Sequence, residues 1–315
     1  MSKFSQLKSK SIIRVSNSSL SFGFDPGDIS SPDVGSGAGF DQVSAFEMHY
    51  ELHGEENKEA LILVSGWTLK KEMWIAQVSA FEKHYKVLTF DNRGVGKSDR
   101  PDMPYTMELF ADDLAGLMDA LEIDKAHMMG YALGGMYLQK FALKYPERLK
   151  KLILLNTVAS FPDDEGVENV KNINIKALSF QQNAPNKYFM RSAKMAFHRS
   201  FIKELEANPD KKFHNLWKVE DITKEYNIDP QTPKDVENQG NAMLGFNLLD
   251  QISEIENETL IIAASHNRLH PKAAMEAMHE KIPNSQFEVI KKAGDSDYLS
   301  RAPEINELVL NFLAD

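Results

Sequence analysis

Short aliphatic segments alternate with helical segments along this chain, and no other feature of the sequence constrains its fold as strongly. Ala60–Val64 and Lys86–Phe90 are typical of buried strands, and residues 107–121 carry apolar side chains at helical spacing. This alternation is the pattern of a mainly parallel sheet covered by helices on both faces. We therefore predict an α/β fold from about residue 44 onward.

A very short connection joins the next strand to the next helix. We predict the strand at residues 127–130 and the helix at 134–145, so the turn between them needs small residues. Later strands are expected at 152–155, 260–264 and 286–290, and a closing helix at 303–313.

The strand pattern is interrupted once, over about a hundred residues from 157 to 256. This segment has the length of an inserted cap and is predicted to form helices and polar loops. We therefore expect a core built from residues 44–156 and 257–315, with a helical cap insertion at 157–256. Residues 1–43 are expected to be a tail and linker, with glycine and serine concentrated at 30–39.

Composition narrows the choice of partners and compartment. The net charge of -10 disfavours binding to nucleic acid or to an anionic membrane, and the absence of cysteine excludes disulfides and thiolate chemistry. No stretch is long and apolar enough for a membrane span, so we predict a soluble, cytoplasmic protein. The serine-rich first 24 residues, which carry basic side chains and no acid, leave an organelle transit peptide as the alternative.

Three motifs stand at the ends of predicted strands: Leu63-Val64-Ser65-Gly66-Trp67 with Trp74 downstream, Phe90-Asp91-Asn92-Arg93-Gly94-Val95-Gly96-Lys97-Ser98-Asp99, and Gly130-Tyr131-Ala132-Leu133-Gly134-Gly135. Their order and spacing resemble the α/β-hydrolase superfamily, in the capped branch that includes small esterases, haloperoxidase-like enzymes and proline iminopeptidases. The resemblance covers most of the chain from residue 44 and is weakest in the cap. It implies an α/β-hydrolase fold, with helices flanking a mainly parallel central sheet.

The same resemblance locates a catalytic triad, and this chain departs from it at all three positions. The nucleophile elbow, a sharp strand-to-helix turn, carries Ala132, whose methyl group cannot attack a carbonyl. The acid position matches Asn267, and the position of the catalytic histidine matches Asp295. His266 and His270 flank the acid position, and the sequence leaves open whether either reaches the pocket.

Loss of the serine alone removes ordinary serine hydrolysis, since it costs roughly 10⁶ in turnover, or about 8 kcal/mol. An engineered serine-to-alanine change would explain Ala132 but would leave the other two positions untouched. The three departures together therefore favour a naturally degenerate triad.

Backbone groups of the site do not depend on side-chain identity. In this family an oxyanion hole is built from two backbone N–H groups, which match Trp67 and Leu133. We expect ligand contacts from these two residues and from Tyr131, Ala132 and Asp295. Ser65 departs from the histidine that commonly precedes the glycine of this loop.

Several other side chains have both a functional and a structural interpretation. Ser65 and Ser98 are hydroxyls near the expected site, and the charges of Asp91 and Arg93 are expected to hold turns together. No metal or other cofactor is predicted. Aromatic and methionine side chains of the cap either line an apolar pocket or pack the cap itself: Tyr188, Phe189, Met190, Met195, Phe197 and Phe201.

The main functional hypothesis from the sequence is a non-catalytic protein that binds a small apolar or carbonyl-containing ligand, or a protein partner. The alternative is a hydrolase or lyase without a covalent step, in which Asp295 has a raised pKa and acts as general base. A purely structural role is the third. The sequence leaves the ligand and the oligomeric state open.

Overall fold

The computed structural model describes residues 11–15, 46–161 and 163–314. Its described strands form one sheet in the order β1-β2-β4-β3-β5-β6-β7-β8. β2 pairs antiparallel with both β1 and β4, and every later pair is parallel. The strands are β1 Ser11–Val15, β2 Phe46–His53, β3 Ala60–Val64, β4 Lys86–Phe90, β5 Ala126–Tyr131, β6 Leu149–Leu155, β7 Thr259–Ala264 and β8 Ser285–Ile290.

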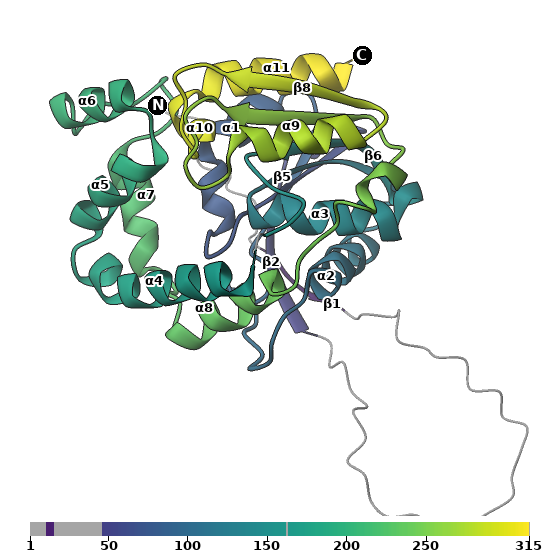
Figure 1. Ribbon diagram of the computed structural model, residues 1–315, viewed down its shortest axis with the longest axis horizontal. Helices are drawn as coiled ribbons and strands as arrows, with labels where there is room; N and C mark the ends of the chain where they lie inside the picture. Colours follow the sequence, from purple (N-terminus) through teal and green to yellow (C-terminus); the bar gives the residue numbers. More distant parts are fainter. Residues whose placement is uncertain (1–10, 16–45, 162, 315) are drawn as a thin grey trace, which may run out of the picture.

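Helices cover both faces of the sheet (Figure 1). Helices α2, α3 and α9 bury side chains in one hydrophobic cluster, and α1 and α11 bury theirs in another. The core helices are η2 Lys71–Trp74, α1 Ile75–Phe81, α2 Met107–Ala120, α3 Leu133–Lys144, η3 Pro146–Arg148, α9 Lys272–Lys281, α10 Asp297–Ser300 and α11 Ala302–Ala314.

The central strands show why the aliphatic runs predict this architecture. All five residues of β3 are buried. Leu61 and Leu63 belong to the cluster with α1 and α11, whereas Ile62 and Val64 belong to the cluster with α2 and α3. A strand covered on both faces needs apolar side chains at every position. The predicted α/β fold, mainly parallel and flanked by helices, is confirmed.

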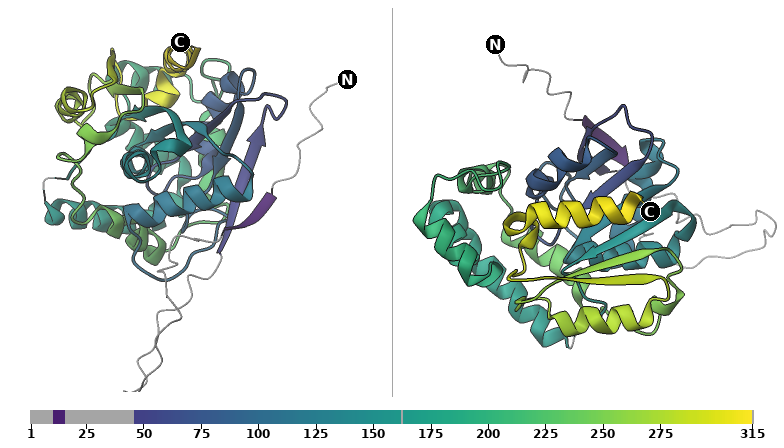
Figure 2. Two further views of the ribbon diagram at one scale, coloured as in Figure 1. Left: turned by 90° about the vertical axis from the view of Figure 1, so that its right-hand side faces the viewer. Right: turned by 90° about the horizontal axis from the view of Figure 1, so that it is seen from above.

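Between β6 and β7 the chain forms helices that lie as an arc beside the sheet (Figures 1 and 2). We call residues 157–256 the cap, using the predicted boundaries, which stay a prediction. Its helices are α4 Asp164–Asn183, α5 Pro185–Ala196, α6 Arg199–Ala207, α7 Val219–Thr223, η4 Lys224–Asn227, α8 Pro233–Gly240, η5 Asn241–Met243 and η6 Ile252–Glu254.

The predicted N-terminal tail contains a strand that the sequence analysis did not expect. Residues 11–15 form β1, which pairs with β2 at the edge of the sheet (Figure 2). The remainder of the predicted tail, including the linker at 30–39 and most of the possible transit peptide, lies outside the described residues.

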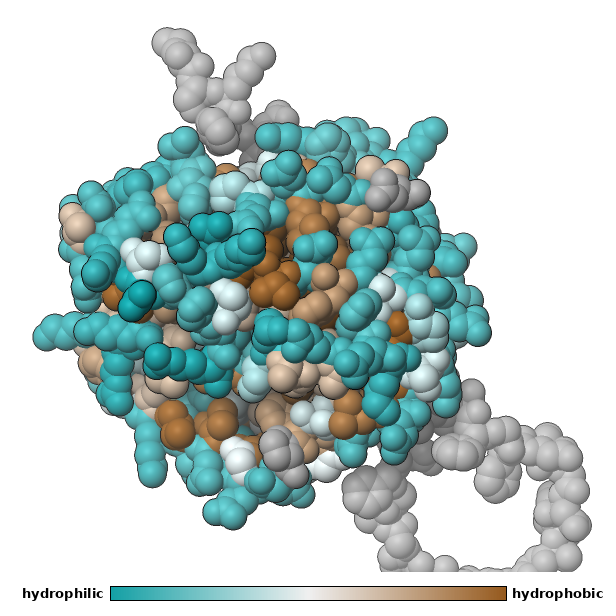
Figure 3. All heavy atoms as spheres, turned by 45° about the horizontal axis from the view of Figure 1, so that its top comes forward, coloured by the Kyte–Doolittle hydropathy of each residue, from teal (hydrophilic) through white to brown (hydrophobic). Residues whose placement is uncertain are grey.

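Hydrophilic side chains cover most of the face seen in Figure 3, with hydrophobic residues exposed between them. Among the described helices, none combines the length and apolar character needed to cross a membrane.

Candidate active site

The turn between β5 and α3 has the backbone of a nucleophile elbow. Ala132 is the single residue between strand and helix, with φ 50° and ψ -118°. Residues other than glycine rarely adopt a positive φ, and they hold it only where the surroundings enforce it. Two contacts help to do so here: the N–H of Ala132 donates to the Leu155 carbonyl at 3.2 Å, and its carbonyl accepts from Thr157 Oγ1 at 2.7 Å.

The glycines around the elbow are required by close backbone contacts. A Cβ on Gly130 would lie 2.7 Å from the backbone of Gly134 and Gly135, and a Cβ on Gly134 would lie 2.5 Å from the Val64 carbonyl oxygen. The helix therefore starts directly above the sheet, as the short connection predicts.

The loop after β3 lies beside the elbow. Val64 at the end of β3 is in register with Gly130 at the end of β5, and a Cβ on Gly66 would contact the Tyr131 ring. Within the described part of the chain, neither the backbone N–H of Trp67 nor that of Leu133 has a hydrogen-bond acceptor. The Trp67 indole donates to the Val236 carbonyl of α8, which joins this loop to the cap.

Asp295 lies in the loop between β8 and α10 and is 3% exposed. Its Oδ1 accepts from Asn267 Nδ2 at 2.8 Å and contacts His270 Nδ1 at 2.7 Å. Its Oδ2 accepts from the hydroxyl of Tyr131, the residue before the elbow. The structure thus brings three of the predicted site positions, Tyr131, Asn267 and Asp295, into one network.

The charge of Asp295 differs from the prediction. Burial by itself raises the pKa of this carboxyl, but attraction to His270 and the hydrogen bonds from His270, Tyr131 and Asn267 outweigh burial and lower the pKa below its ordinary value. The expectation of a raised pKa, drawn from burial alone, is therefore wrong. Asp295 is held as a carboxylate.

Asn267 fixes the loop that carries His270. Its Oδ1 accepts the backbone N–H groups of Leu269 and His270, both at 2.9 Å, while its amide nitrogen donates to Asp295. The sequence did not distinguish between the two neighbouring histidines, and the structure does. His270 contacts Asp295, whereas the exposed His266 bonds to Ser265 and packs against the ring of His198.

A second buried carboxyl, Asp297, supports the same loop. Asn156, at the end of β6, donates to the Asp295 carbonyl and to Asp297 Oδ1, both at 2.8 Å, and accepts from the N–H of Ala264 at 2.9 Å. Burial and the nearby Asp295 raise the pKa of Asp297 well above its ordinary value, which favours its neutral form. Sequence reasoning missed Asn156, for which no motif gives a signal.

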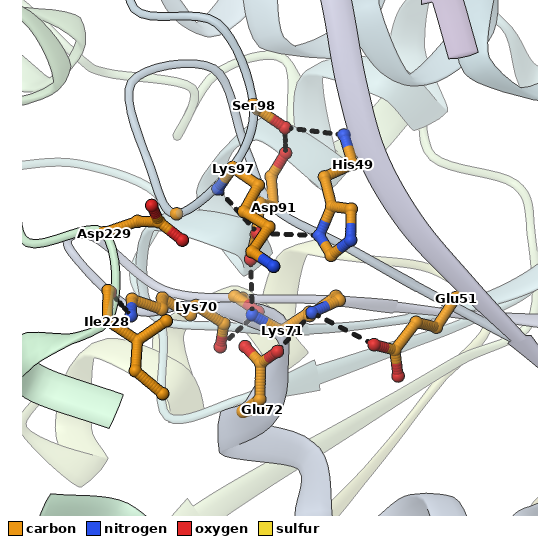
Figure 4. A network of polar contacts seen from close by, with 12 residues as sticks. His49, Glu51, Lys70, Lys71, Glu72, Asp91, Lys97, Ser98, Ile228 and Asp229 are labelled. Atoms are coloured by element: carbon orange, nitrogen blue, oxygen red, sulfur yellow. Dashed lines mark hydrogen bonds and ion pairs between the residues drawn. The ribbon is translucent and has the colours of Figure 1, made fainter. Parts of the chain in front are cut away.

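The motif after β4 is a structural network, as predicted (Figure 4). Asp91 accepts from the backbone N–H groups of Lys71 and Lys97 at 3.0 and 3.2 Å and contacts His49 Nδ1 at 3.2 Å. Arg93 forms a bidentate ion pair with the buried Asp113.

The two serines near the expected site also contact backbone groups. Ser98 Oγ donates to the Asp91 carbonyl at 2.6 Å and accepts from the N–H of His49. Ser65 Oγ lies 3.4 Å from the Lys70 carbonyl. Their structural interpretation is the one that these contacts support.

The aromatic residues of the cap mainly pack with one another. Phe189, Phe197 and Phe201 are buried in a cluster with Trp217, while Met195 is 56% exposed to solvent.

A cavity of about 240 Å³ lies elsewhere, between β2, η2 and η4. Its lining includes Glu51, the buried Lys71 and Glu225 but neither Ala132 nor Asp295. Among the described residues, no group of three or more potential ligands is placed to hold a metal ion.

Residues 59–302 match the family model of the alpha/beta hydrolase fold. The chain belongs to the α/β-hydrolase fold family. Its elbow, the adjacent β3 loop and the loops after β7 and β8 all lie within the matched residues.

Relatives and solved structures of this family are similar over most of the chain. A relative from Caulobacter vibrioides (strain NA1000 / CB15N), which carries the name "Putative carbamate hydrolase RutD", is 28% identical over 84% of this chain and 95% of its own length. A malate-bound thermophilic esterase from Thermogutta terrifontis is 26% identical, with a TM-score of 0.72 over 87% of this chain and 96% of its own. An enol-lactonase from Burkholderia xenovorans LB400 has a TM-score of 0.70 at 22% identity, covering 86% and 97% of the two chains.

These comparisons overturn the main functional hypothesis from the sequence. A non-catalytic binding protein is contradicted, because the matched relatives are named as carbamate hydrolases and the solved neighbours include an esterase and an enol-lactonase. The sequence argument equated loss of the serine with loss of activity. The alternative hypothesis, an enzyme without a covalent step, agrees better with these findings.

Proposed function

We propose that this α/β-hydrolase family member is a hydrolase of small esters, lactones or carbamates in which water attacks the carbonyl directly. In this proposal the family's triad is degenerate, and no acyl-enzyme forms because Ala132 carries no nucleophile. The substrate classes follow the names of the similar proteins.

The observation that carries the proposal is the buried carboxylate of Asp295. It occupies the position of the family's base, it is 3% exposed, and it is linked through Tyr131 to the elbow. Isolated burial would neutralise such a group, and here Tyr131, Asn267 and His270 together hold its charge. A buried charge that needs three side chains to maintain it, next to the elbow, favours proton transfer at the site over a purely structural role.

The backbone around the elbow supplies the second part of the site. The N–H groups of Trp67, in the loop after β3, and of Leu133, at the start of α3, have no acceptor among the described residues and are suited to stabilise the oxyanion that forms as water adds to a carbonyl. Loss of one such donor typically costs 10²–10³ in turnover. Ala132 lacks the serine oxygen, so the attacking water occupies the space of the missing hydroxyl in this proposal.

The test is an assay of wild-type protein, Asp295→Ala and Asp250→Ala on a panel of activated esters, lactones and carbamates. Asp250 is 99% exposed in its side chain and serves as the matched control. We expect steady turnover without an initial product burst, a loss of about 100-fold or more in Asp295→Ala, and no change in Asp250→Ala.

A rebuilt variant, Ala132→Ser/Asn267→Asp/Asp295→His, checks the covalent route separately. It is expected to show the burst of an acyl-enzyme that wild-type protein lacks. A burst in wild-type protein contradicts direct attack by water. No turnover by wild-type protein on any substrate, or full activity in Asp295→Ala, overturns the proposal.

A further inference from the structure

We infer that His270 is the catalytic base of this site and that Asp295 positions it, so that the base and the acid have exchanged loops. In the family the acid follows the strand that is β7 here and the histidine follows β8. In this chain His270 follows β7 and Asp295 follows β8, and His270 Nδ1 lies 2.7 Å from Asp295 Oδ1. This assignment rests on the proposed function and names the proton acceptor within it.

Asp295 is poorly placed to accept a proton itself. Its Oδ1 is occupied by Asn267 and His270 and its Oδ2 by Tyr131, and little of the residue is exposed. A carboxylate offers about four lone-pair directions, of which three are used here. Its lowered pKa also makes it a weak base. These contacts suit a group that holds another side chain in place.

His270 has the complementary arrangement. A carboxylate only accepts hydrogen bonds, so the contact with Asp295 requires a proton on Nδ1, and in a neutral imidazole the lone pair is then on Nε2. Nothing in the described part of the chain bonds to Nε2. The side chain is 13% exposed, which leaves it open to a water molecule.

The ring of His270 is also fixed next to the elbow. Its backbone N–H donates to Asn267 Oδ1, which sets the turn of the loop. Its ring meets the ring of Tyr131 edge-on, with centroids 6.5 Å apart. Tyr131 directly precedes Ala132, so the backbone of the elbow and the imidazole share one rigid neighbour.

The reaction follows from this geometry. Nε2 of His270 takes a proton from water as the water oxygen bonds to the substrate carbonyl carbon, and the π electrons of the C=O bond move to its oxygen. When the tetrahedral intermediate collapses, the bond to the leaving group breaks, and the leaving atom receives the proton from Nε2. The products are an acid and an alcohol or amine, and His270 returns to its neutral form.

His266 provides a matched control. It lies four residues before His270 in the same loop region, yet it is exposed and bonds to Ser265 rather than to Asp295. Loss of His266 removes a nearby imidazole without touching the proposed pair.

The experiment compares wild-type protein, His270→Gln, His270→Gly, Asp295→Asn and His266→Gln on the best substrate of the panel. We expect kcat to fall about 100-fold or more in His270→Gln with KM within about threefold, partial rescue of His270→Gly by added imidazole, and no more than a twofold change in His266→Gln. Nitrogen-15 NMR of the histidine rings in wild-type protein reports the tautomer independently of activity. A proton on Nδ1 of His270, absent from that position in Asp295→Asn, is expected.

The results distinguish failure of the His270 assignment from failure of the proposed function. Retained activity in His270→Gln together with loss in Asp295→Asn overturns the assignment of His270 and leaves the hydrolase proposal standing. A neutral His270 with its proton on Nε2 in wild-type protein also overturns the assignment. No turnover by wild-type protein overturns the proposed function itself, and the assignment with it.

Discussion

Asp295 lies in the loop after β8 and Asp297 begins α10 two residues later; both are buried, and their pKa values are shifted in opposite directions. Burial raises both. For Asp295 the attraction of His270 and three hydrogen bonds outweigh burial, whereas Asp297 has Asn156 as a side-chain donor and is repelled by Asp295. The surroundings therefore favour the charged form of Asp295 and the neutral form of Asp297.

Asp297→Asn is expected to become more stable relative to wild-type protein as pH rises from about 4 to 8. The folded protein keeps Asp297 protonated, while the unfolded chain ionises it near its ordinary pKa, so its contribution to stability is complete at low pH and is lost as pH rises towards the folded pKa. The amide of Asn does not ionise, so the variant does not lose stability in this way as pH rises. Thermal unfolding at pH 4, 6 and 8 should show the difference in Tm growing by a few °C. A difference independent of pH contradicts the prediction, and Asp250→Asn is the exposed control.

Asp295→Asn is expected to show the opposite trend. The folded pKa of Asp295 is lowered, so its contribution to stability is present above the pKa of the unfolded chain and disappears as pH falls through the folded pKa. The variant should therefore be less stable than wild-type protein at neutral pH and approach it in acid. Chemical denaturation at pH 7 and pH 3 measures this. A deficit that is equal at both pH values counts against an ionised Asp295.

Ala132→Gly is expected to stabilise the fold by about 1 kcal/mol. A non-glycine residue at a sparsely populated φ/ψ costs roughly 1–3 kcal/mol, which glycine avoids. The greater freedom of glycine in the unfolded chain offsets about 0.5–1 kcal/mol of this stabilisation. Ala142→Gly, inside α3, is the matched control and should destabilise by about 1 kcal/mol. Urea denaturation compares the two, and equal destabilisation would show that the elbow stores no strain.

The sequence predicts the central sheet well, because strands buried on both faces form nearly continuous apolar runs. Ala60–Val64 and Lys86–Phe90 coincide with β3 and β4. Strand β2, which lies between the edge strand β1 and β4, was missed, since polar residues such as Glu47 and His49 interrupt its apolar side chains. Apolar runs identify fully buried strands more readily than partly buried ones such as β2.

Only the local part of the candidate site could be predicted from the sequence. The elbow is a local feature, and Gly130 and Gly134 reveal it in the sequence. The pairing of His270 with Asp295 is not local, because it joins residues 25 positions apart that meet where the parallel strands β7 and β8 end side by side. The direction of the Asp295 pKa shift depends on that meeting and could not be obtained from burial alone.

Arg93→Met is expected to destabilise the fold by about 3–5 kcal/mol without changing the activity of the folded protein. Arg93 pairs with Asp113 through two hydrogen bonds of 2.6 and 2.7 Å, and its guanidinium lies 4.0 Å from the Phe46 ring centroid. Removal of Arg93 takes the counterion away from a buried charge, whereas replacement of both partners, as in Arg93→Met/Asp113→Leu, should recover much of the lost stability.

Arg148→Met is the control. Arg148 pairs with the largely exposed Asp119, and loss of that pair should cost less than about 1 kcal/mol. Urea denaturation gives the stabilities, and an assay at low temperature should give wild-type kcat and KM for Arg93→Met. A large change in KM with unchanged stability would place Arg93 in the site and remove its structural interpretation.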